Sequence, residues 1–326
     1  MIAPYALRLV CLCLGSFFLV NAVLGLAMSL ASRAAIRIAE TMRPRSAARF
    51  LFVLRLLPLL LGVGAVLGLC VPSYLWFEPQ ASSERIGWAC LTLALLAVAG
   101  WLLSIARVAR AIAVSLRCHR VWQQAGRMAH LSGDTSPALV VEKDVPLLAL
   151  AGVLRPRLVI SDGVLRSLSA EQLDVALQHE NAHRVSRDNL KRLLLLLAPA
   201  PLPFVHGFSL LEQAWVKFSE WAADDEAARG ESFRALSLAA ALLCVARMGT
   251  GPRLSLLHTS LAAGDRDLSA RIDRLLRVEP ACPAPLPRTR SLFVPAGVGT
   301  TVCLATLILW PATLSSVHRL LEQFLR

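Results

Sequence analysis

Long uncharged apolar stretches alternate with short arginine-rich stretches along this chain. Each of four apolar stretches is long enough to cross a bilayer as a helix, because about 20 residues span the hydrocarbon core. The first exceeds the length of a signal peptide and is followed at once by Arg33 and Arg37, so we expect it to remain in the protein. The pattern therefore predicts transmembrane helices at residues 9–32, 56–77, 87–105 and 291–317.

These helices divide the chain into three parts. Residues 1–105 form a predicted three-helix membrane region, residues 106–290 a separate domain, and residues 291–326 a C-terminal transmembrane helix with a short tail. After Arg107, apolar positions alternate with arginines at helical spacing, which predicts a linker helix lying along the membrane surface.

The middle part also contains a region with the composition of a small sheet. Short runs rich in β-forming residues are separated by Gly, Pro and Asp, a pattern typical of strands joined by turns. An edge of this sheet could hold an extended peptide substrate, or the sheet could be structural only; both interpretations remain open. The predicted strands cover residues 138–142, 146–150 and 157–161.

Composition and charge agree with a membrane protein. Hydrophobic residues make up 56% of the chain and the mean hydropathy is +0.58, too apolar for an ordinary soluble protein. The net charge of +12 comes mainly from arginines. Residues 33–49 hold five Arg and one Glu, whereas residues 78–85 hold two Glu and one Arg. Under the positive-inside rule the first stretch is cytoplasmic and the second external, which also puts residues 106–290 in the cytoplasm. We therefore expect a multi-pass protein of the bacterial inner membrane, with the lipid bilayer as a partner.

Two other classes of chemistry are not supported. No basic run is interleaved with aromatic residues, so we expect no direct binding to nucleic acid. The eight cysteines are scattered and include no CxxC pair, so neither a disulfide framework nor a thiolate zinc site is indicated. They are best interpreted as small apolar residues.

The candidate chemistry lies in an HExxH motif. His179 and His183 are four residues apart, so on a helix they share one face and can bind one metal ion. Glu180 lies next to the first ligand, where it can act on a metal-bound water molecule. Ser169, followed three residues later by Gln172, is a typical helix start. The motif therefore predicts a zinc-binding helix.

A second predicted helix, over residues 218–227, supplies a third ligand. Glu220 and Asp224 are four residues apart and share one face of this helix. Two histidines with one glutamate form a common catalytic zinc set, which makes Glu220 the candidate third ligand. Asp224 would then accept the ring N–H of a ligand histidine and fix its orientation. The alternatives for the third ligand are Asp225 and Glu226.

An uncharged run at residues 193–211 separates the two helices. If it crossed the membrane once, the histidines and Glu220 would lie on opposite sides, and one zinc ion cannot be shared across about 30 Å of hydrocarbon. The run also contains Pro199, Pro201 and Pro203, which break a helix. We therefore expect a bent or re-entrant, membrane-associated segment.

The motifs together resemble a known family. The runs at residues 155–165 and 168–173, then HExxHxxxRDN and ExxADDEA, are similar to the membrane metallopeptidases of the BlaR/MecR antirepressor type, and more distantly to those of the HtpX and CAAX-protease type. This resemblance implies a mainly α membrane protein: about four transmembrane helices with a cytoplasmic α+β zincin-like (gluzincin) metallopeptidase domain. It also implies zinc on His179, His183 and Glu220, with Glu180 as the catalytic base and Asp224 in support.

We thus expect a regulatory zinc endopeptidase acting on a cytoplasmic or membrane-proximal protein or peptide, such as a transcriptional repressor. The alternative is a catalytically silent membrane signalling or scaffold protein that retains a structural zinc site. A zinc transporter is less favoured, because the four predicted spans contain no His, Asp or Glu.

Overall fold

The computed structural model of the chain describes most of the membrane region and the central domain. It describes residues 5–77, 86–129, 137–142, 146–154, 156–200, 206–248, 259–260, 265–277 and 311–325.

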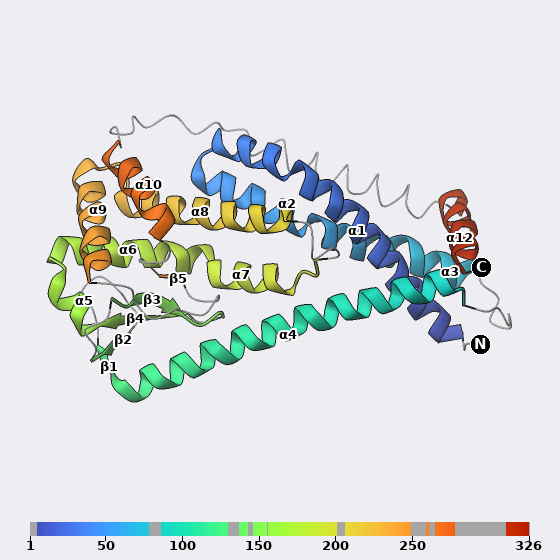
Figure 1. Cartoon of the computed structure of the whole chain (residues 1–326), viewed down its shortest axis with the longest axis horizontal. Helices are drawn as coiled ribbons and strands as arrows, with labels where there is room; N and C mark the ends of the chain where they lie inside the picture. Colours follow the sequence, from blue (N-terminus) through green and yellow to red (C-terminus); the bar gives the residue numbers. More distant parts are fainter. Residues whose placement is uncertain are drawn as a thin grey trace.

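Three long apolar helices could each cross a membrane (Figure 1). The first is α1 (Tyr5–Glu40) and the third is α4 (Trp88–Ala125). The second combines α2 (Pro44–Ala65), the π-helical η1 (Val66–Cys70) and α3 (Val71–Phe77) in one run. The prediction of apolar helices long enough to span a membrane is confirmed for these three. The predicted fourth span falls mostly outside the described residues, which resume at Pro311.

The helices are longer than their apolar stretches indicated. The predicted arginine-rich loop at residues 33–49 is mostly helical, because α1 continues to Glu40 and α2 begins at Pro44, a residue favoured in the first turn of a helix. Likewise α4 runs without interruption to Ala125, so the helix predicted after Arg107 is present as a continuation of the third apolar helix, and its position along the membrane surface stays a prediction. The sequence over residues 106–125 contains no Gly or Pro, and nothing there ends the helix.

The end of α4 leads into a five-stranded mixed sheet with the order β1-β2-β4-β3-β5. The β2 and β4 strands pair in parallel and the other neighbours are antiparallel. The three predicted runs are confirmed as strands, whereas β1 and β5 were not predicted. The strands are β1 (Gly126–Ala129), β2 (Ala138–Val141), β3 (Leu148–Ala151), β4 (Arg157–Ser161) and β5 (Thr259–Ser260).

Helices cover this sheet and connect it to the membrane region. In Figure 1, α6 lies over the sheet and α8 runs beside α6 toward α1 and α2. One core cluster joins the sheet to α6 and α9, and a second joins α8 to α1 and α2. The helices are α5 (Asp162–Ser167), α6 (Ala170–Ser186), α7 (Asp188–Leu197), α8 (Gly207–Ala228), α9 (Ser232–Arg247), α10 (Asp265–Leu276) and α12 (Pro311–Leu325).

The apolar run at residues 193–211 is divided between two helices. Its first part ends α7 at Leu197, and its last part begins α8 at Gly207. Because α8 returns beside α6, residues before and after the run lie together. The predicted break in the helix is therefore present, while its association with the membrane stays a prediction.

Candidate metal centre

The N-terminal cap of α6 fixes where this helix begins. Ser169 Oγ accepts a hydrogen bond from the Gln172 backbone N–H at 3.3 Å, and the Gln172 side chain accepts one from the Ser169 N–H at 3.0 Å. This reciprocal pair confirms the predicted helix start. The buried face contains Val175 and Ala176, then His179 and Glu180 one turn later, and His183 after one further turn. The local sequence thus points the motif into the protein, toward α8.

Three side chains on α6 and α8 converge so that they could hold a metal ion. His179 Nε2 and His183 Nε2 are 3.2 Å apart. Glu220 Oε2 lies 3.5 Å from His179 Nε2, and Glu220 Oε1 lies 3.6 Å from His183 Nε2. Tetrahedral zinc with bonds of about 2.0–2.1 Å separates its ligand atoms by about 3.3 Å. All three side chains are buried, so the donor set fits a zinc ion both in atom type and in spacing.

A carboxylate faces the other ring nitrogen of each histidine. Asp224 Oδ1 lies 3.0 Å from His179 Nδ1, where the sequence had placed a supporting carboxylate. His183 Nδ1 donates a hydrogen bond of 2.8 Å to Asp188 Oδ2. With the proton held at Nδ1, each Nε2 keeps a lone pair directed at the shared centre.

Two residues of this arrangement had no role assigned from the sequence, although Asp188 lies in the HExxHxxxRDN run. Asp188 follows Arg187, whose backbone has a left-handed conformation. Glycine is the usual residue in this conformation, so the arginine at position 187 did not indicate a turn. Arg271 comes from α10, 47 residues after Asp224, and donates to its two carboxylate oxygens at 2.7 and 2.9 Å. Its third nitrogen lies 3.2 Å from Glu220 Oε2. The sequence assigned no role to Arg271, although the run Arg271-Ile-Asp-Arg-Leu was visible in it.

The alternative third ligands face elsewhere. Asp225 accepts a hydrogen bond of 2.6 Å from Arg274, and its side chain is 42% exposed. Glu226 pairs with Arg45 at 3.7 Å on the surface. Of the three acidic candidates, only Glu220 lies beside the histidines.

The electrostatics of the site favour a cation between the histidines. Burial favours neutral histidine, but Glu220 and Asp188 outweigh it and raise the pKa of His183 to about 10. Asp224 and Glu220 likewise overcome burial and raise the pKa of His179. Burial would also raise the pKa of Glu220, yet the charges of His183 and Arg271 and the bonds to both histidines hold it well below its usual range. A proton or a metal ion satisfies this arrangement.

Glu180 is buried without a partner. It is 1% exposed, and neither carboxylate oxygen has a hydrogen-bond partner among the described residues. Burial raises the pKa of Glu180 to about 7. Burying an unpaired carboxyl group destabilises a protein, and such groups are concentrated at functional sites.

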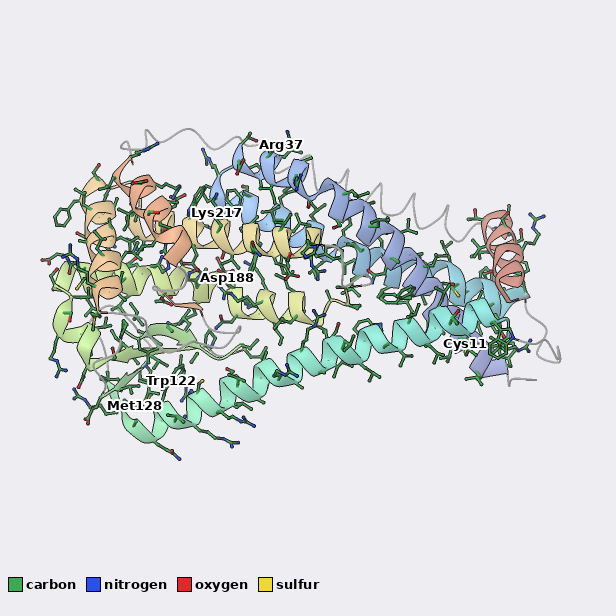
Figure 2. The ribbon with its side chains drawn as sticks, in the orientation of Figure 1. Cys11, Arg37, Trp122, Met128, Asp188 and Lys217 are labelled. Atoms are coloured by element: carbon green, nitrogen blue, oxygen red, sulfur yellow. The ribbon has the colours of Figure 1, made fainter. Side chains whose placement is uncertain are left out.

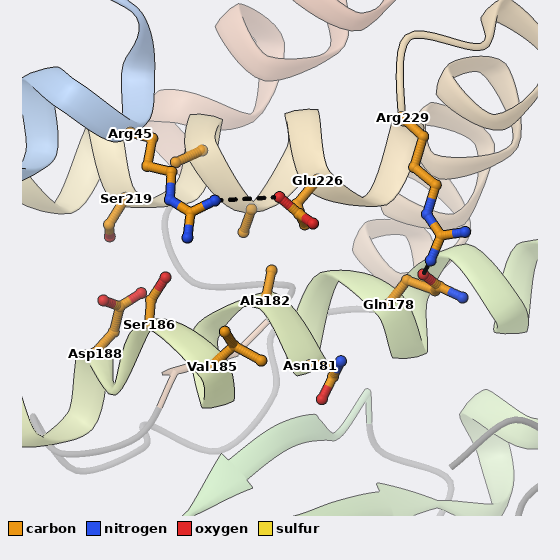
Figure 3. A pocket seen from close by; sticks show the side chains of 12 residues that line it. Arg45, Gln178, Asn181, Ala182, Val185, Ser186, Asp188, Ser219, Glu226 and Arg229 are labelled. Atoms are coloured by element: carbon orange, nitrogen blue, oxygen red, sulfur yellow. Dashed lines mark hydrogen bonds and ion pairs between the residues drawn. The ribbon is translucent and has the colours of Figure 1, made fainter. Parts of the chain in front are cut away.

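Two cavities adjoin the centre. One, of about 100 Å³, lies between α6 and α8. In Figure 3 the bond from Arg229, at the end of α8, to Gln178 on α6 crosses this space, while Arg45 on α2 pairs with Glu226 on the α8 side. The other, of about 300 Å³, is lined by His183 itself together with Leu150 at the end of β3. Access to the ligands is therefore closest from the junction of α6 and α7.

Compared with known proteins, the chain matches no family model and no curated protein.

Proposed function

We propose that this chain is a zinc-dependent endopeptidase of the inner membrane. The main evidence is the buried group of His179, His183 and Glu220, whose ligand atoms have the separations found around zinc. The carboxyl group of Glu180, which has no hydrogen-bond partner among the described residues, lies beside this group. A structural metal site has no use for such a carboxyl group, whereas peptide hydrolysis requires one. The motifs that resemble the BlaR/MecR type support the same assignment.

The metal and the carboxyl group of Glu180 have different roles in the proposed hydrolysis. Zinc, when bound, acts as a Lewis acid that polarises the scissile carbonyl and acidifies a water molecule. Glu180 takes a proton from the attacking water on one carboxylate oxygen and returns it to the leaving amine. A pKa of about 7 suits both steps, because the group can accept and release a proton at neutral pH.

The remaining residues hold the ligands in place. Asp188 and Asp224 keep the protons of the two imidazoles at Nδ1. Arg271 joins Asp224 to Glu220 and so fixes α8 against α10. The substrate is a cytoplasmic or membrane-proximal protein, such as a transcriptional repressor, since the arginine distribution puts this domain in the cytoplasm.

One observation favours a second function, a silent scaffold with a structural zinc. The three ligands and Glu180 are each no more than 4% exposed, and structural zinc sites are closed in the same way. Under this alternative the fold needs the ligands but not the carboxyl group of Glu180.

Glu180→Gln separates the two functions, because it keeps the size of the side chain and removes only the carboxylate. We expect purified wild type and Glu180→Gln to contain equal zinc by metal analysis, while cleavage of a protein substrate panel, and any self-cleavage, is lost in the variant. Glu226→Gln, on the surface of α8, is the matched control and should keep its activity. Equal cleavage by wild type and Glu180→Gln, or none by either, would favour the scaffold.

A further inference from the structure

Four cysteines that are scattered in the sequence gather at the end of the bundle away from the sheet. Cys11 and Cys13 are on α1, Cys70 ends η1, and Cys90 is in the first turn of α4. Cys11, Cys70 and Cys90 are buried in one cluster, with Cys13 packed against it. Figure 2 labels Cys11 at this end, far from Asp188 in the candidate metal centre. The interpretation of these cysteines as isolated apolar residues is therefore incomplete.

Two of the thiols are in contact. Cys13 Sγ and Cys70 Sγ are 3.9 Å apart, although 57 residues separate them in the chain. Cys70 is 2% exposed, whereas Cys13 is only partly buried. A disulfide bond of about 2.05 Å requires the sulfur atoms to approach by roughly 2 Å.

The backbone at Cys70 is also unusual. Residues Val66–Cys70 form a π-helical turn, a rare conformation that occurs frequently at functional sites. One turn later, Tyr74 donates a hydrogen bond of 3.2 Å to the backbone carbonyl of Tyr5. This bond holds the second span to α1 one turn away from the thiol pair.

We propose that Cys13 and Cys70 are a redox modification site that closes reversibly into a disulfide and regulates the candidate metal centre. Each thiol loses one proton and one electron as the S–S bond forms. A lipid-soluble quinone takes up both protons and both electrons and leaves as the quinol. The oxidant has to be lipid-soluble, because Cys70 lies seven residues, or about 10 Å, inside the end of the second span at Phe77.

Geometry and expected location favour oxidation over metal binding. In the part of the chain that the structure describes, only the His179 group brings three potential metal ligands together, so the thiols form a pair and not a metal cage. The arginine distribution places this end of the bundle on the external side, where disulfides persist.

A disulfide between Cys13 and Cys70 would affect α8, the helix that carries Glu220, through its contacts with α1 and α2. Both α1 and α2 pack against α8 in one core, with Ala35, Leu51 and Phe218 among its buried residues. Arg55 on α2 also donates to Glu212 on α8 at 2.8 Å. A covalent link between α1 and the second span restricts their relative movement, and α8 rests on both. This regulatory part rests on the proposed function, whereas formation of the bond does not.

The bond is tested in membranes containing the full chain. Diamide, which accepts the two hydrogens of a thiol pair, is added, free thiols are alkylated, and non-reduced peptides are mapped by mass spectrometry. We expect a Cys13–Cys70 linked peptide, reversed by dithiothreitol, in both wild type and Glu180→Gln. It should be absent from Cys13→Ala and present in Cys118→Ala, whose thiol lies outside the cluster. Links only between other cysteines or between chains, or copper(I) binding to the pair without a linked peptide, would overturn the proposal.

The regulatory part is tested by cleavage in the same membranes. We expect oxidation to change the cleavage rate at least about fivefold, the lower range of typical allosteric coupling. The change should be reversed by dithiothreitol and absent from Cys13→Ala. An unchanged rate despite complete Cys13–Cys70 linkage would overturn regulation by the pair. Absence of cleavage in both redox states would refute the peptidase assignment, while the linked peptide would still establish the modification site.

Discussion

The hydrogen bond from His183 to Asp188 joins the end of α6, which carries the two histidines of the candidate metal centre, to the start of the next helix. Asp188 is the first residue of α7 and is 3% exposed, and its carboxylate lies 2.8 Å from Lys191 Nζ. Burial would raise the pKa of Asp188, but His183 and Lys191 lower it, so the carboxylate is charged and can only accept hydrogen bonds. This fixes the proton of His183 at Nδ1 and leaves Nε2 for a metal ion.

Asp188→Asn should therefore weaken metal binding without removing a ligand. An amide can present its N–H₂ group to the ring and favour the wrong tautomer, so we expect a loss of about 10–100-fold in zinc affinity, as is typical for partners of ligand histidines. Competition with a chromogenic chelator measures the affinity. Asp224→Asn should have a similar effect through His179, and Asp225→Asn on the surface of α8 should have little. Unchanged affinity in Asp188→Asn would mean that this hydrogen bond does not orient His183.

Glu220→Ala tests the third ligand directly. Its carboxylate lies within 3.6 Å of both Nε2 atoms, so its removal should reduce zinc content about as severely as His183→Ala. Glu226→Ala is the matched control, because this residue is six positions later on the same helix and exposed. Metal analysis of the three purified variants compares them. Full zinc content in Glu220→Ala would exclude Glu220 as a ligand.

The parts of this site that could be predicted are those encoded locally. The cap at Ser169, the spacing of His179 and His183, and the spacing of Glu220 and Asp224 all follow from helical periodicity over one or two turns. The strands at residues 138–142 and 157–161 were equally visible, because β-rich runs between turn residues form a local signal.

The parts that could not be predicted depend on tertiary contacts. Arg271 reaches Asp224 from 47 residues away, and Cys13 meets Cys70 across 57 residues; neither separation leaves a periodic signal. The strand β1 (Gly126–Ala129) is not rich in β-forming residues. It pairs with β2 because it directly follows α4, which ends beside that strand. Helix lengths were underestimated because hydropathy reports the apolar core of a helix and not its polar ends.

The ion pair between Arg55 and Glu212 should stabilise the contact between the membrane region and α8. Arg55 is 4% exposed and also lies 4.3 Å from the ring of Phe208, so Glu212→Gln leaves a buried guanidinium without its counter-charge. We expect a destabilisation of about 1–3 kcal/mol, below the value for a fully buried pair because Glu212 is 38% exposed. Thermal unfolding in detergent measures this loss. Glu226→Gln breaks the exposed pair with Arg45 and should cost less than about 1 kcal/mol; equal midpoints for the two variants would contradict the prediction.

The orientation of the domain in the membrane is the last prediction, and it decides which proteins the site can reach. Val185 is 67% exposed at the end of α6, and the Glu226 side chain is 62% exposed on α8, so both positions accept a cysteine without disturbing a core. In a background without the native cysteines, we expect Val185→Cys and Glu226→Cys to react with an impermeant thiol reagent in inverted membrane vesicles but not in intact cells. The arginines of residues 33–49 favour this result, because positive charge is retained on the cytoplasmic side. Ser82→Cys, in the acidic segment expected outside, is the control and should react in intact cells. If Val185→Cys and Glu226→Cys react in intact cells, the centre faces outward and a cytoplasmic repressor cannot be its substrate.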